Sequence, residues 1–100
     1  MASVEDVIAA VAASFGVAPV DILSRSRRAA IVEARHAAMY LARTLIGTSL
    51  PAIAQAFERA HHATVLHAVR KIEARRATCV DTAARLDRLE AVLLRAEAIQ

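Results

Sequence analysis

The chain has 100 residues, of which 57% are hydrophobic and 3% aromatic, and its formal net charge is +3 at pH 7. This length suits one domain with a single small core and leaves no room for an additional ATPase or second enzyme domain. No run approaches the roughly 18 apolar residues that span a bilayer, and the first residues lack the features of a signal peptide, so we expect a cytoplasmic protein. The scarcity of aromatic residues and the abundance of alanine favour close-packed helices over a sheet.

The first predicted element is a helix over residues 4–15. Ser3 and Asp6 have the spacing of a capping box, and Gly16 offers a C-terminal stop. Apolar residues recur between them at helical spacing: Val4, Val7, Ile8, Val11 and Phe15.

A short segment and a basic loop come next. Residues 17–23 predict a brief turn or a single helical turn that starts at Pro19, with Val20 and Leu23 directed inward. Residues 24–28 then read Ser-Arg-Ser-Arg-Arg and predict a loop, so positive charge directly precedes the next helix.

A long helix is predicted from Ala29 to just before Gly47. Its apolar stripe comprises Ile31, Ala34, Ala38, Leu41 and Leu45.

Residues 49–74 predict a short helix, a turn and a longer basic helix. Ser49 can cap the short helix, and Pro51 lies in its first turn, where a missing N–H costs nothing. The short helix has one apolar face: Leu50, Ile53, Ala54 and Phe57. The pattern restarts as a second stripe: Val65, Ala68, Val69 and Ile72. The opposite side of the second helix is polar: His67, Arg70, Lys71 and Arg75. This arrangement is typical of a helix-turn-helix DNA reader, with one face for packing and the other free for phosphate.

A last amphipathic helix closes the predicted core. Its stripe comprises Val80, Ala84, Leu86, Leu89, Leu93 and Ala96. The single cysteine, Cys79, cannot form an internal disulfide, and we interpret it as a small helix residue. The predicted fold class is all-α, a compact bundle of five or six helices containing a helix-turn-helix motif, with residues 1–100 forming one domain.

Positive charge is concentrated in the middle of the chain. Residues 25–76 carry ten Lys and Arg against three Glu, whereas residues 1–24 carry three acids and neither Lys nor Arg. Such asymmetry is typical of a protein that binds a polyanion. A membrane surface could use the same charge, but the apolar stripes that would anchor it are expected in the core.

The three arginines of the basic loop, Arg25, Arg27 and Arg28, have two readings. A loop arginine can enter a DNA minor groove, where phosphates on both sides focus the negative potential. The alternative is an ordinary solvated charge cluster, because surface arginines are common.

His61, His62 and His67 do not have metal-ligand spacing. Ligands on one helix are separated by three or four residues, whereas His61 adjoins His62, and His67 follows His62 by five residues. We interpret His61 and His62 as residues at the start of a recognition helix, directed at base edges or phosphates. The alternative is a polar helix start with no ligand.

The sequence contains no GxxxxGK[ST], GxSxG, HExxH or CxxC motif. The acidic residues occur where helix caps and solvated faces are expected. We therefore predict neither enzymatic activity nor a metal, cofactor or small-molecule substrate.

Three segments together resemble a known family. They are residues 35–45 (Arg-His-Ala-Ala-Met-Tyr-Leu-Ala-Arg-Thr-Leu), residues 49–53 (Ser-Leu-Pro-Ala-Ile) and residues 62–73 (His-Ala-Thr-Val-Leu-His-Ala-Val-Arg-Lys-Ile-Glu). A chain with these segments in this order resembles the C-terminal DNA-binding domain of the bacterial chromosomal replication initiator DnaA. Domains of this family bind short asymmetric duplex boxes at replication origins and some promoters.

The resemblance assigns roles to individual residues. It implies that Arg27 enters the minor groove and that His62 and Thr64 read the major groove. It also implies that the sugar-phosphate backbone is held by Arg35, Leu50, Pro51 and residues 67–71. The complete set of expected DNA-binding residues is Arg25, Arg27, Arg28, Arg35, His36, Leu50, Pro51, His61, His62, Ala63, Thr64, His67, Arg70 and Lys71.

The chain departs from the family pattern in the recognition segment. After Phe57 the family usually has Gly-Gly-Arg-Asp-His-Thr-Thr, whereas this chain has Glu-Arg-Ala-His-His-Ala-Thr in residues 58–64. His61 and Ala63 thus replace a base-reading Asp and a Thr, and His36 replaces a Gln. At about 1–3 kcal/mol for each good base contact, these replacements should weaken or redirect specificity.

Two hypotheses on function follow. The first is a stand-alone relative of the initiator that binds double-stranded DNA at similar boxes in the nucleoid and modulates replication initiation or transcription without its own ATPase. The second is a protein-interaction adaptor that contacts the initiator or its regulators. His61 and Ala63 favour the adaptor slightly, whereas Arg27, Arg35, His62, Thr64 and Lys71 favour DNA.

Overall fold

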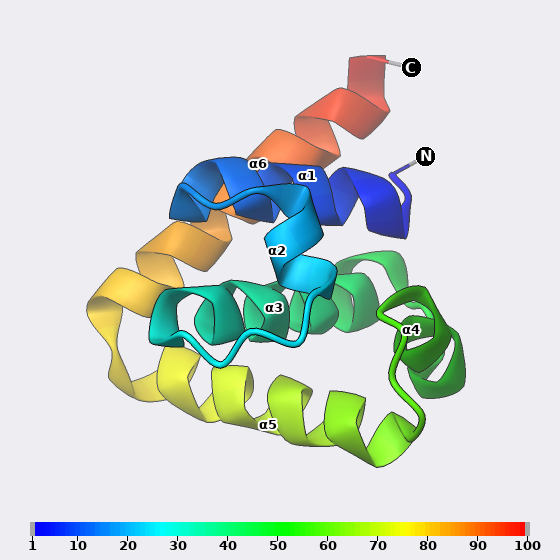
Figure 1. Ribbon diagram of the computed structural model, residues 1–100. Coiled ribbons are helices and arrows are strands. Elements are labelled where there is room, and N and C mark those ends of the chain that lie inside the picture. The colour runs from blue at the N-terminus through cyan, green and yellow to red at the C-terminus, as the bar shows by residue number, and fades with distance from the viewer. Residues whose placement is uncertain (1, 100) are drawn as a thin grey trace.

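The computed structural model describes residues 2–99, with the surroundings of side chains up to Arg95. Within this range the chain forms six α-helices (Figure 1). Their bounds are α1 Val4–Phe15, α2 Pro19–Leu23, α3 Ala29–Leu41, α4 Leu50–Ala56, α5 His62–Thr78 and α6 Val80–Ile99, and a π-helical turn, η1 (Ala42–Ile46), continues α3. The predicted all-α class is confirmed.

Local capping explains where α1 and α4 begin. The Ser3 hydroxyl accepts from the Asp6 N–H and the Asp6 carboxylate accepts from the Ser3 N–H, which completes the predicted capping box. Gly16 ends α1 with a left-handed φ of 67°. At α4 the Ser49 hydroxyl accepts from the Ala52 N–H, and Pro51 lies in the first turn as predicted.

The long helix α3 lies at the centre of the bundle. It packs against α5 on one side and α1 on the other, while α4 contacts α5, and α6 lies over α1 and the C-terminal part of α5 (Figure 1). The fully buried large side chains come from all six α-helices and the connection after α4: Val7, Val11, Ile22, Met39, Leu41, Ile53, Phe57, Val65 and Leu86. This shared core holds the helix-turn-helix pair α4 and α5 in place.

The predicted stripes are mostly, but not wholly, correct. Val20, predicted to be directed inward, is 71% exposed, and Ile22 is the buried residue of α2. A helix this short can pack only one narrow side against α1 and α3. Val80 is 83% exposed, since it opens α6 at the surface, whereas Leu86, Leu89 and Leu93 are buried as predicted. The side chain of Ala96 lies outside the described residues.

Cys79 is not inside a helix. It is the single residue between α5 and α6, with extended backbone and a half-buried side chain. None of the described helices is long and apolar enough to cross a membrane.

Candidate nucleic-acid interface

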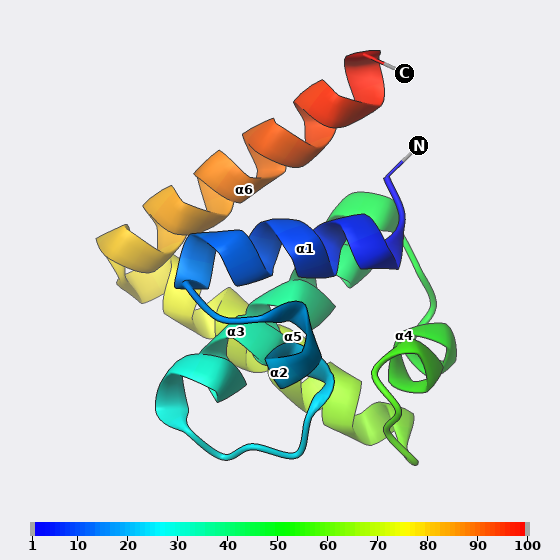
Figure 2. The same ribbon diagram turned by 45° about the horizontal axis from the view of Figure 1, so that its top comes forward.

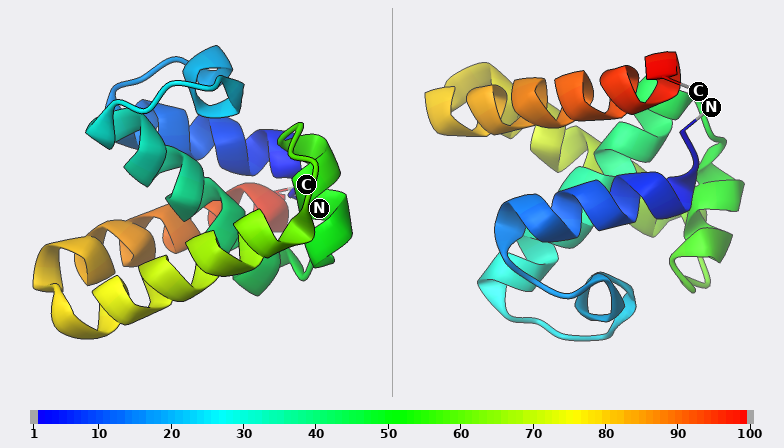
Figure 3. Two further views of the ribbon diagram at one scale, coloured as in Figure 1. Left: turned by 60° about the horizontal axis from the view of Figure 1, so that its bottom comes forward. Right: turned by 90° about the horizontal axis from the view of Figure 1, so that it is seen from above.

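The basic loop and the start of α5 lie on the same side of the molecule. Figure 2 shows both at the lower edge, with α6 at the opposite, upper edge and α1 between them. Figure 3 also places α6 and the loop on opposite sides when the molecule is seen from above. The basic loop and the start of α5 thus lie on the side of the molecule opposite α6.

The turn between α4 and α5 presents the N-terminus of α5 to solvent. Phe57 is fully buried and anchors the turn, and Glu58 follows with a φ of 55°. His61 precedes the first residue of α5, and no side chain caps that helix. The four side chains from His61 to Thr64 are all exposed. The unsatisfied N–H groups and the positive end of a 17-residue helix therefore face outward, which favours an anion.

The predicted two-sidedness of α5 is confirmed. Val65, Ala68, Val69 and Ile72 are buried, whereas His67, Arg70 and Lys71 are exposed. These three polar side chains continue the exposed surface from the start of α5 along the helix.

His36 on α3 borders the same surface. Its ring lies 6.4 Å from the ring of His67, measured between centroids, in an edge-to-face arrangement. Burial, followed by the nearby charges of Lys71, His67 and Arg35, lowers the pKa of His36 to about 4. His36 is therefore neutral near pH 7, and it lines a cleft of about 350 Å³ together with Arg27 and Lys71.

The basic loop has an ordered backbone. The Ser24 hydroxyl accepts from the Ser26 N–H at 3.1 Å, and the Ser26 hydroxyl accepts from the Arg28 N–H at 3.3 Å. Arg25, Arg27 and Arg28 are exposed, and no ion pair joins them to a carboxylate in the described part of the chain. Three guanidinium groups are thus available to a ligand on this loop.

The Arg35 side chain is not available to hold the DNA backbone as expected. It is only 7% exposed, and its guanidinium group donates to four backbone carbonyls, those of Asp21, Ile22, Ser24 and Ser26. Burial, with a smaller effect of Arg59, lowers its pKa. The expectation that Arg35 holds a DNA phosphate is therefore corrected: the side chain is committed to shaping the loop between α2 and α3.

Two structural arginines were not predicted. Arg59 donates to the carbonyls of Ser24 and Phe57. Arg76 donates to the Tyr40 hydroxyl and to the carboxylates of Asp87 and Glu90, whose hydrogen bonds, Glu90 foremost, raise its pKa. Arg76 follows Ile72 by four residues on the buried stripe, so its inward position had a sequence signal, whereas Arg59 had none.

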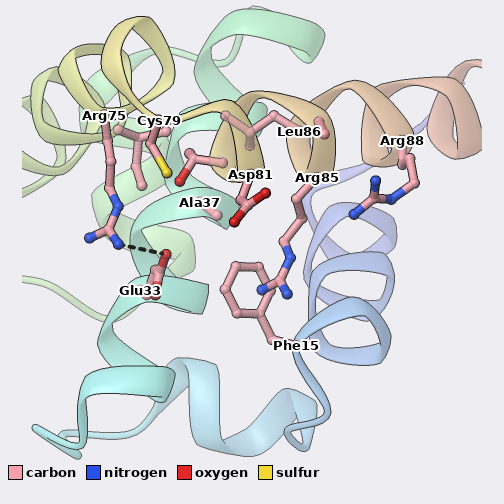
Figure 4. A pocket seen from close by; sticks show the side chains of 12 residues that line it. Phe15, Glu33, Ala37, Arg75, Cys79, Asp81, Arg85, Leu86 and Arg88 are labelled. Atoms are coloured by element: carbon pink, nitrogen blue, oxygen red, sulfur yellow. Dashed lines mark ion pairs between the residues drawn. The ribbon is translucent and has the colours of Figure 1, made fainter.

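The far end of α5 has a separate cavity. Figure 4 shows Arg75 paired with Glu33 at 3.7 Å and Arg85 stacked over the Phe15 ring at 4.3 Å. The cavity measures about 440 Å³ and also includes Cys79. Its lining mixes acids and bases, and no group of three potential metal-ligating side chains occurs among the described residues.

Comparison with known families decides the relationship. The sequence model of the family described as "Bacterial dnaA protein helix-turn-helix" matches residues 4–72. The chain belongs to this DnaA helix-turn-helix family. The matched range contains all the expected DNA-binding residues and ends before α6 begins.

Curated relatives and a solved structure agree with the DnaA assignment. The chain is 49% identical over 70 residues to the chromosomal replication initiator protein DnaA of Xanthobacter autotrophicus, and 51% identical over 71 residues to that of Bradyrhizobium sp.. These alignments cover 70% and 71% of the chain but only 14% and 15% of the relatives. A crystal structure of a DNA replication initiation factor superposes with a TM-score of 0.84 at 34% identity, covering 93% of this chain and 28% of that one.

Proposed function

We propose that this chain binds double-stranded DNA at sites like DnaA boxes and, through that binding, modulates replication initiation or transcription. The observation that carries the proposal is the common face of the basic loop and the N-terminus of α5. Its exposed arginines and free helix N–H groups suit phosphate, and the exposed start of α5 suits a major groove.

The proposed roles follow the family resemblance, except at Arg35, whose side chain is buried. Arg27 enters the minor groove from the loop, with Arg25 and Arg28 beside it. His61, His62, Ala63 and Thr64 face bases at the start of α5. The sugar-phosphate backbone is contacted by Leu50, Pro51, His67, Arg70 and Lys71, with neutral His36 among the residues that line the neighbouring cleft. Arg35 acts indirectly by shaping the loop.

The proposal treats the chain as a single DNA-binding domain. The chain spans about a seventh of the length of the curated relatives that it matches. By binding alone, such a domain can modulate replication initiation or transcription, because it occupies sites that the full initiator also uses. The proposed location is the bacterial nucleoid.

The direct test measures binding to a duplex carrying a DnaA box and to a scrambled duplex across a salt series. We expect tighter binding to the box and a linear fall of log affinity with log salt concentration. Arg27→Ala should weaken binding about tenfold, because a minor-groove arginine contributes both charge and shape readout. Arg88→Ala, which removes an exposed arginine from α6, is the matched control and should have little effect. Unchanged affinity of Arg27→Ala at moderate salt would contradict the proposed docking.

A second candidate function is the protein-interaction adaptor. The observation in its favour is α6, which lies outside the family match and exposes Val92 and Leu94 at 53% and 51%. An adaptor that contacts the initiator or its regulators would bind neither duplex, and Val92→Ser would then weaken capture of purified initiator.

A further inference from the structure

Two guanidinium groups meet at one carbonyl oxygen in the basic loop. Nη2 of Arg35 donates to the Ser24 carbonyl at 2.7 Å, and Nη2 of Arg59 donates to the same oxygen at 2.9 Å. Nη1 of Arg59 also donates to the Phe57 carbonyl at 3.2 Å. Arg59 therefore ties the turn between α4 and α5 to a loop that precedes it by 35 residues in the sequence.

Arg35 fixes the other side of the same loop. It donates to the carbonyls of Ile22 and Ser26 at 2.7 and 3.1 Å. The serine hydroxyls of the loop accept from the N–H groups of Ser26 and Arg28, and the two arginines donate to the carbonyls of Ser24 and Ser26, so the loop backbone is held on both sides. A loop held in this way loses little further conformational freedom when a ligand binds it.

The arrangement concentrates like charges. Burial lowers the pKa of Arg59, and nearby Arg25 lowers it further, while Glu58 opposes the shift. In the free protein this proximity opposes folding, but a polyanion would relieve it. The usual family pattern given above has Gly at the position of Arg59 and Arg at the next, so this tie uses an arginine that the usual pattern lacks at this position.

We propose that Arg59 is a positioning residue that couples the minor-groove loop to the start of α5, so that both meet DNA as one preorganised unit. The proposal rests on the proposed function, because it assumes that both parts contact DNA. The guanidinium group of Arg59 donates to backbone carbonyls, and in the proposed docking it contacts no base.

The first test uses the full chain without DNA. Amide hydrogen exchange at Ser26 and Arg28 should become about tenfold faster in Arg59→Ala, while exchange at Ile72 in the core stays as in the wild type. Arg88→Ala should leave all three amides unchanged, and thermal unfolding checks that each variant is folded. Unchanged exchange in the loop of Arg59→Ala overturns the proposal.

The second test is a double-mutant cycle with Arg27→Ala, using the box duplex as probe. Arg59→Ala should reduce affinity about tenfold in the wild-type background but less than about twofold in the Arg27→Ala background, because the contact that Arg59 positions is already absent when Arg27 is alanine. Equal losses in both backgrounds, with a salt slope lower by one unit, would show that Arg59 touches phosphate itself and overturn the coupling. Arg59→Lys keeps the charge without the planar fork, so full affinity in that variant would also overturn it.

The two proposals fail in different ways. If the wild type binds no duplex, the proposed function fails, and the coupling role fails with it. If the wild type binds and the cycle is additive, only the coupling role fails.

Discussion

Lys71 and Arg35 are both basic residues close to the candidate interface, but their side chains have opposite surroundings. Lys71 is exposed on α5, whereas Arg35 is buried with four carbonyl partners. A charge affects DNA affinity directly only if phosphate can approach it. The two residues therefore lead to different expectations.

Lys71→Ala should weaken binding to box and scrambled duplexes alike and lower the salt slope by about one unit, because a phosphate contact carries no sequence information. Arg35→Ala should instead lower the free energy of unfolding by about 2–3 kcal/mol, since buried carbonyls lose charged donors. Salt-dependent binding and urea unfolding measure the two effects. A loss confined to one duplex in Lys71→Ala would mean that this residue reads bases.

His36 makes stability depend on pH. Its pKa is lowered to about 4 in the folded chain by burial and by Lys71, His67 and Arg35, whereas the ordinary value is 6.5. The unfolded chain therefore binds a proton first, and stability falls as the pH drops from about 6.5 to about 4. His36→Gln should flatten this part of the profile, as followed by urea unfolding at several pH values. Comparing the wild type with His36→Gln at pH 7.5 gives the effect of the substitution itself on stability. Parallel profiles of stability against pH in the two proteins would contradict the role assigned to His36.

At the level of elements, the connection between α4 and α5 carries a backbone cost. Glu58 has a φ of 55°, a left-handed conformation that is unfavourable for a residue with a Cβ. Glu58→Gly should raise the free energy of unfolding by about 1 kcal/mol in thermal or urea unfolding. Glu58→Gln removes the same charge and keeps the strain, so it should show no such gain.

Gly47 supplies the reverse control. Its φ is 80°, and a Cβ there would meet no atom within 4 Å, so Gly47→Ala reports the conformational cost alone. Gly47→Ala should lower the free energy of unfolding by about as much as Glu58→Gly raises it. A gain in Glu58→Gln equal to that in Glu58→Gly would assign the effect to charge.

Elements with local signals could be predicted from the sequence. The capping box at Ser3 and the cap at Ser49 mark helix starts, and the stripe from Val65 to Ile72 identifies the buried side of α5. Val20 was misplaced because one helical turn is too short for a period to be measured. Short-range patterns therefore gave the helices and the exposed surface of α5.

Long-range contacts could not be predicted in the same way. The carbonyl partners of Arg35 lie 9 to 14 residues away, and Arg59 reaches a carbonyl 35 residues away. A guanidinium group that binds backbone oxygen has no partner side chain to mark it in the sequence. The structural roles of both arginines therefore depend on how the helices pack together, which no local pattern in the sequence indicates.

For the whole molecule, the substitutions at the start of α5 separate DNA binding from the adaptor role. His61→Asp with Ala63→Thr restores the carboxylate and hydroxyl of the family pattern. At one to two good base contacts of about 1–3 kcal/mol each, the ratio of box to scrambled affinity should rise at least about fivefold, while total affinity changes little because the new carboxylate also repels phosphate. Competition binding at one fixed salt concentration measures this ratio.

His61→Asp should also stabilise the free protein by about 1 kcal/mol, because α5 lacks a side-chain cap and Asp is a strong N-cap residue. His61→Asn with Ala63→Thr is the matched control, since Asn caps the helix without adding charge. It should share the gain in stability but not the full gain in specificity, because Asn lacks the carboxylate that accepts from a base. If the wild type binds both duplexes more weakly than about micromolar, and the Asp and Thr pair creates no preference, the surface is not a DNA reader. Direct binding of purified initiator to α6 would then favour the adaptor function.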